Sequence, residues 1–121
     1  MRTLSQIPSY SRRKALRVDT PEGVRVYWSC AGRSDVSRIR NLSFGGIFIE
    51  TRTPQSVGAE AEIAFLVEEG QIRTKAVVRH TESASGMGLE FTGLAHEDRP
   101  HLGALLTRLR SLSRSRPNSP D

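Results

Sequence analysis

The sequence predicts a mainly β protein, a six-stranded antiparallel β-barrel with one C-terminal α-helix, and three observations support this fold. Apolar and polar residues alternate along six short segments, turn-forming residues separate these segments, and a leucine stripe at helical spacing follows them. No helical pattern interrupts the six segments, which favours a barrel or a sandwich. A barrel is the better interpretation because closure removes the exposed edges that so small a sheet would otherwise leave.

The first predicted strand shows the alternation most clearly. Val24, Val26, Trp28 and Cys30 are apolar and more polar residues stand between them, so the strand has one face for the core and one for solvent. Turn residues, with glycine or proline prominent among them, bound the later segments. The predicted strands are residues 24–30, 36–40, 47–49, 60–67, 71–81 and 86–91.

After Gly93 the period of the apolar residues changes from that of a strand to that of a helix. Leucines then recur on one face, and we expect this stripe to cover one side or mouth of the barrel. Pro100 should lie in the first helical turn, where its missing N–H group matters least. The stripe consists of Leu102, Leu105, Leu106, Leu109 and Leu112.

Length and composition favour a single soluble domain. We expect a flexible lead-in at residues 1–9, one domain at residues 10–112 and a disordered tail at residues 113–121. The single cysteine, Cys30, lies in an apolar stretch, which predicts a buried thiol in a reducing compartment. We find neither a signal peptide nor an apolar run of membrane-spanning length, and therefore expect a cytoplasmic protein without a membrane partner.

The charge balance has two interpretations. The chain has 18 Lys+Arg against 13 Asp+Glu, a formal charge of +5, and all of these cations except Lys14 and Lys75 are arginines. The planar, permanently charged guanidinium suits phosphates and guanine edges, which indicates an anionic partner. A genome of high G+C content would produce the same bias, so composition alone decides nothing.

The residues that carry enzyme chemistry do not form a recognisable pattern. His80, His96 and His101 have no metal-ligand spacing with Cys30, so we expect solvated histidines and no bound metal. The sequence also contains no nucleophile elbow, no phosphate-binding GxxxxGK[ST] loop and no GxGxxG strand-to-helix turn. We therefore predict a binding protein without a cofactor, and not an enzyme.

A first candidate cluster lies before the first predicted strand. Arg13 and Arg17 are four residues apart and Arg12 precedes them directly. Arginine-rich segments are commonly just solvated. This one, however, stands where the chain can fold back across the barrel surface.

A second candidate cluster, Asn41–Gly46, is a turn between two predicted strands. Asn41 and Ser43 are two residues apart, so in extended backbone their amide and hydroxyl groups share one face. Gly45 and Gly46 permit positive φ angles and close approach of a ligand. The alternative is an ordinary turn in which Asn and Ser cap backbone groups and the glycines supply the bend.

Taken together, the two clusters resemble the PilZ domain family, whose pattern is RxxxR, a spacer of one strand and its turn, and then [D/N]xSxxG. The pattern falls here on Arg13, Arg17, Asn41, Ser43 and Gly46. Residues 86–92 resemble the family's last strand, commonly G-x-G-[VLI]-x-F, and the leucine-striped helix follows as in the family. The resemblance covers about residues 12 to 112.

The resemblance implies a six-stranded β-barrel and, since many PilZ domains are bacterial receptors for the second messenger c-di-GMP, a nucleotide ligand. Arg13 and Arg17 would hold guanine edges and phosphates, while Asn41 and Ser43 would receive the other side of the ligand. Gly46 would keep the barrel surface open. Further candidate contacts are Arg12, Gly45 and Arg40.

Binding would join a mobile N-terminal segment to the fixed barrel and signal through a downstream protein partner. The protein would be a monomer or a ligand-dependent dimer. One alternative is a PilZ-fold interaction module that binds no nucleotide. Another is a nucleic-acid binder, which the few aromatics disfavour, because Trp28 and Phe65 share faces with core residues and Phe44 alone is expected to be exposed.

Overall fold

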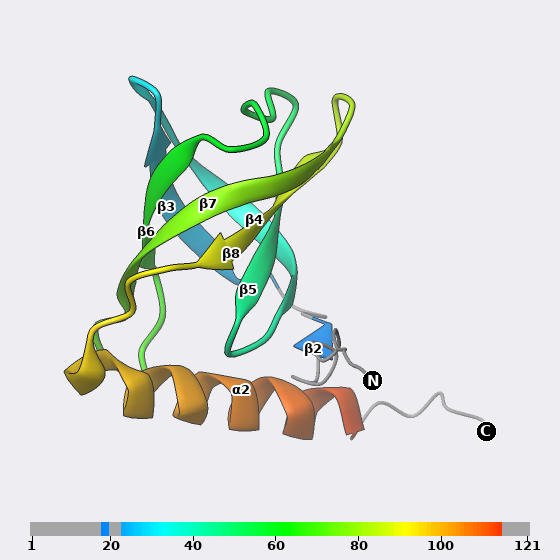
Figure 1. Ribbon diagram of the computed structural model, residues 1–121. Coiled ribbons are helices and arrows are strands. Elements are labelled where there is room, and N and C mark those ends of the chain that lie inside the picture. The colour runs from blue at the N-terminus through cyan, green and yellow to red at the C-terminus, as the bar shows by residue number, and fades with distance from the viewer. Residues whose placement is uncertain (1–17, 20–22, 115–121) are drawn as a thin grey trace, which may run out of the picture.

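The computed structural model describes residues 18–19 and 23–114. These residues form a barrel with one long helix across one of its open ends (Figure 1). The elements are β2 (Val18–Asp19), β3 (Arg25–Cys30), β4 (Arg33–Leu42), β5 (Gly46–Glu50), β6 (Glu60–Phe65), β7 (Arg73–Glu82), β8 (Gly86–Phe91), the 3-10 helix η2 (His96–Asp98) and α2 (Arg99–Arg114).

The sheet closes on itself as predicted. Its strands follow the order β4-β3-β6-β7-β8-β5, and β5 pairs with β4 again, so six antiparallel strands form a ring. The two-residue strand β2 is an addition that alternation did not predict, and it pairs with β4 outside the ring. Closure places β5 and β8 on the wall opposite β3 and β6.

Strand β4 is longer than the predicted 36–40 because its hairpin with β3 is tighter than expected. Ala31 and Gly32 both have positive φ angles, 54° and 82°, and form a two-residue turn. Cys30 therefore pairs directly with Arg33. At its other end β4 continues through Asn41 and Leu42, which were predicted to belong to the turn and instead pair with β5.

The core consists of the apolar faces that the alternation predicted. Trp28 is completely buried, and its Nε1 donates a hydrogen bond of 3.0 Å to Oγ of Ser37, itself buried. This bond satisfies the one polar group that the largest core side chain carries. The apolar side chains that face the barrel interior therefore form one core cluster.

Helix α2 closes one end of the barrel, as the leucine stripe predicted. Leu102, Leu105, Leu106 and Leu109 are buried in the core, whereas Leu112 is 38% exposed because the helix runs on past the barrel. Pro100 lies in the first turn as expected. The helix continues to Arg114, beyond the predicted domain end at residue 112, and the rest of the predicted tail lies outside the described residues.

Polar contacts also fasten α2 to the connection between β6 and β7. Arg108 forms a two-bonded ion pair with Glu69, and His101 Nδ1 donates to the carbonyl of Gln71 at 2.7 Å. The buried carboxylate of Asp98, just before the helix, accepts a bond of 3.0 Å from the backbone N–H of Arg73. The helix is thus held at several points along its length.

Candidate functional site

The short strand β2 brings the N-terminal part of the chain to the Asn41 turn. Val18 pairs with Leu42 and Asp19 pairs with Asn41. Arg17 directly precedes Val18 in the sequence, but Arg12, Arg13 and Arg17 lie outside the described residues. The pairing therefore relates the two predicted clusters through the backbone of β2.

A β-bulge in β4 turns Asn41 toward the outer surface. Ile39 pairs with Ile49 and Asn41 pairs with Phe48, so two steps along β4 match one step along β5 and Arg40 is the extra residue. Ile39 and Leu42 are both fully buried in the core. The two residues between them therefore face outward together, which strict alternation would not permit.

Ser43 organises the turn that follows Asn41. Its Oγ accepts hydrogen bonds of 3.1 Å from the backbone N–H groups of both Gly45 and Gly46, and the side chain is only 5% exposed. The backbone N–H of Ser43 donates to the carbonyl of Gly46 at 2.9 Å. The capping role that the ordinary-turn interpretation assigned to serine is therefore present.

Gly46 serves a different purpose from the one expected, whereas its neighbour Gly45 is exposed. Neither has a positive φ angle; among the described glycines only Gly32, Gly58 and Gly70 do. Gly46 is buried rather than open to a ligand, and a Cβ there would lie 2.5 Å from the backbone oxygen of Leu89 on β8. Glycine is required here so that β5 and β8 can approach each other.

Asn41 belongs to a row of outward-facing residues that crosses β4, β5, β8 and β7. Asn41 pairs with Phe48, Phe48 with Gly88, and Gly88 with His80. Phe48 lies outside the core, yet it is only 4% exposed, and its ring lies 5.7 Å from that of His80. A Cβ on Gly86 would lie 2.4 Å from Phe48, so the glycines of β8 make room for these rings.

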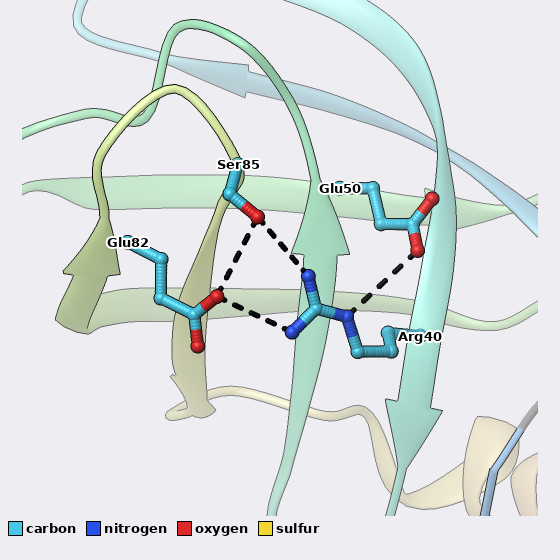
Figure 2. Close-up of polar contacts among 4 residues, drawn as sticks. All are labelled: Arg40, Glu50, Glu82 and Ser85. Carbon is cyan, nitrogen blue, oxygen red and sulfur yellow. Dashed lines mark hydrogen bonds and ion pairs between the residues drawn. The ribbon is translucent and has the colours of Figure 1, made fainter.

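The bulged Arg40 covers this aromatic ring. Its Cζ lies 4.2 Å from the Phe48 ring centroid, and NH1 lies 3.3 Å from Oε1 of Glu82. NH2 donates to Oγ of Ser85 at 3.2 Å, and Nε lies 3.8 Å from Oε2 of Glu50 (Figure 2). The guanidinium therefore joins β4 to β5 and to the hairpin between β7 and β8.

Sequence reasoning missed this aromatic and arginine cluster, although one signal was present. Phe48 stands between Ile47 and Ile49, and successive side chains of a strand point to opposite faces, so Phe48 is on the outer face. An apolar ring on that face must be shielded from water by another side chain. Its cover, Arg40, comes from a neighbouring strand and from a bulge that alternation does not show.

The tip of the turn contacts helix α2. Phe44 is 45% exposed, as predicted, and its ring lies 5.8 Å from the Arg99 guanidinium. A Cβ on Gly103 would lie 3.4 Å from the same ring. The expectation that Phe44 alone is exposed was wrong, because Tyr27 is 43% exposed on the outer face that alternation assigns to it.

The groups capable of catalysis are spread out. The described residues contain no cluster of His, Cys, Asp and Glu that could hold a metal ion. Cys30 is buried as predicted, and burial raises the pKa of its thiol above the ordinary 9.0. His80 is exposed but packs against Phe48 instead of standing free. Across the described ranges, no helix is long and apolar enough to cross a membrane.

A closed, helix-capped barrel with an Asn-x-Ser-x-x-Gly turn beside its N-terminal segment defines a class of small barrel domains with an outer-surface site. The PilZ domain model matches residues 11–108, and the chain belongs to the PilZ domain family. The PilZ domain is a receptor and adaptor fold and not a known enzyme family. No curated protein shows a significant match.

Solved structures support the fold. The inhibitor of motility MotI/DgrA of Bacillus subtilis matches with a TM-score of 0.69 and 25% identity, over 91% of this chain and 58% of that one. The K. pneumonia MrkH–c-di-GMP complex matches with a TM-score of 0.66 and 21% identity, over 86% of this chain and 54% of that one. Borreliella burgdorferi PlzA in complex with c-di-GMP matches with a TM-score of 0.51 and 16% identity, over 83% of this chain and 38% of that one. The chain thus spans little more than half the length of MotI and MrkH.

Proposed function

We propose that this chain is a c-di-GMP receptor module that changes conformation on binding and signals through a protein partner. The observation that carries the proposal is the pairing of Asp19 with Asn41, because it brings the segment after Arg13 and Arg17 to the outward-facing amide of the Asn-x-Ser-x-x-Gly turn. The MrkH and PlzA structures in complex with c-di-GMP support the choice of ligand.

The proposed roles follow from the chemistry of each side chain. Arg13 and Arg17 hold guanine edges and phosphates through paired, charge-assisted hydrogen bonds. The Asn41 amide donates to and accepts from the ligand on the barrel side. Both acceptor positions of the Ser43 hydroxyl are filled by the turn, so Ser43 acts mainly by holding the turn that follows Asn41. The function needs no metal and no cofactor, and the protein is not an enzyme.

Helix α2 is the proposed route from the ligand to a partner. It lies against β2 on one side of the site, and its Gly103 lies near the Phe44 ring, which a Cβ added there would approach to 3.4 Å. A ligand that joins the N-terminal segment to the turn therefore acts on two neighbours of the helix at once. The altered surface binds a downstream protein in the cytoplasm, or a second copy of the chain.

The alternative function is a PilZ-fold interaction module that binds no nucleotide. The capped Ser43 turn and the buried Gly46 favour this alternative, because both residues have purely structural contacts in the described part of the chain. The arginine pair favours the receptor, because two guanidinium groups suit the phosphates and guanine edges of the ligand.

Calorimetric titration of c-di-GMP into the full chain tests the proposal. We expect saturable binding at micromolar concentration or tighter, no binding of the linear dinucleotide, and loss of binding in Arg13→Ala and Arg17→Ala. Arg52→Ala, an exposed arginine elsewhere, serves as the control and should bind normally. Absence of binding by the folded wild-type chain would reject the receptor in favour of the interaction module.

A further inference from the structure

The bulge at Arg40 is the feature that decides where Asn41 points. Arg40 has no counterpart on β5, and the core residues Ile39 and Leu42 on either side of the pair are fully buried. If the bulge were lost, alternation from Ile39 would turn Asn41 inward and Leu42 outward. The outward direction of Asn41 therefore depends on whatever stabilises the extra residue.

The Arg40 side chain ties this extra residue to the neighbouring strands. Its guanidinium lies over Phe48, the residue that pairs with Asn41, and binds Glu82 and Ser85 of the neighbouring hairpin (Figure 2). Glu82 and Ser85 are also linked to each other, with Ser85 Oγ 3.5 Å from Glu82 Oε1. Although the Arg40 side chain is 41% exposed, all three nitrogens of its guanidinium have partners, and one face of the guanidinium lies over the Phe48 ring.

Charge indicates that Arg40 does not itself bind an anion. One guanidinium faces two carboxylates, Glu50 and Glu82, so the cluster carries an excess of negative charge. An anionic ligand would be repelled from this side of Asn41. The opposite side of Asn41 is β2, which follows the arginine pair in the sequence.

We propose that Arg40 is a positioning residue for the nucleotide site: it holds the bulge that presents Asn41 to the ligand. This inference rests on the proposed function. It changes the expected role of Arg40 from an additional ligand contact to a residue that acts through Asn41.

Two substitutions separate positioning from contact by the sign of their effects. Arg40→Gln should weaken c-di-GMP binding about tenfold, as expected when one member of a coupled network is removed. If Arg40 acts through its contacts with the neighbouring hairpin, Ser85→Ala, which removes a partner of the guanidinium without changing charge, also weakens binding, and the double variant is no worse than Arg40→Gln. If Arg40 instead binds a phosphate, Ser85→Ala releases the guanidinium and tightens binding, which would overturn the proposal.

Arg79 supplies the matched control. It is the extra residue of a second bulge, between Val78 and His80 on β7, and it forms an exposed ion pair of 2.7 Å with Glu90. Arg79→Gln should leave the affinity for c-di-GMP within about twofold, because its ion pair joins β7 to Glu90 of β8 and involves neither Asn41 nor Phe48.

A ligand-free measurement keeps this inference separate from the proposed function. In the NMR spectrum of the wild-type chain, cross-strand contacts should join Asn41 to Phe48, and Arg40→Gln should weaken them while Arg79→Gln does not. If the wild-type chain binds no c-di-GMP, the proposed function fails, and this comparison still decides whether Arg40 holds the bulge. Unchanged contacts in a folded Arg40→Gln variant would refute the positioning role.

Discussion

The ion pair between Glu69 and Arg108 offers a quantitative test of how helix α2 is held on the barrel. The Glu69 side chain is 11% exposed and that of Arg108 36%, and two hydrogen bonds join them. Hydrogen bonds to charged groups contribute about 1.5–3 kcal/mol, and the exposure of Arg108 reduces this. We expect Glu69→Gln to lower the free energy of unfolding by about 1–2 kcal/mol, or Tm by roughly 4–12 °C.

The same ion pair predicts how this loss depends on pH. The hydrogen bond from Arg108 lowers the pKa of Glu69 below its ordinary 4.5. A lowered pKa means that the stabilisation is complete above the pKa of the unfolded chain and is lost as pH falls through the folded-state pKa. The difference between wild type and Glu69→Gln should therefore be constant near neutral pH and shrink below pH 4.5.

Urea unfolding, measured at neutral pH and at steps down to about pH 3.5, gives this difference directly. Glu90→Gln is the control, because its ion pair with Arg79 is 54% and 57% exposed and should contribute at most about 0.5 kcal/mol. Two results would refute this account of how Glu69 stabilises the fold. One is an equal loss of unfolding free energy in Glu69→Gln and Glu90→Gln, and the other is a difference between wild type and Glu69→Gln that does not shrink in acid.

Three further predictions concern packing. Leu106→Ala should lower the free energy of unfolding by about 2–5 kcal/mol in urea titration, because the side chain is 2% exposed beneath α2. Gly46→Ala should lower the free energy of unfolding by about 1–3 kcal/mol, because its Cβ would meet the backbone oxygen of Leu89. Gly45→Ala should change stability little, because the nearest atom to its Cβ would be 3.9 Å away. Equal melting temperatures of the two variants would contradict this difference. Cys30 should react with a thiol reagent only as fast as the chain unfolds, and rapid labelling of the folded protein would show that it is not buried.

The sequence alone determined the parts of the structure that depend on local periodicity. Alternation identified the six strands of the ring and the buried faces, and the leucine spacing identified the covering helix, because burial acts on each residue through its position in a regular element. The order of the arginine pair, the Asn-x-Ser-x-x-Gly turn and the last strand also indicated the PilZ family, which the family match confirmed.

Only the tertiary structure decided how residues distant in the sequence meet. The bulge at Arg40, the pairing of Asp19 with Asn41 and the contact of Phe48 with the β8 glycines depend on the register between strands. Gly46 is a further example, because a glycine required for the close approach of β8 cannot be distinguished in the sequence from a glycine required for a turn. Register is set by the closure of the whole barrel, and no local pattern records it.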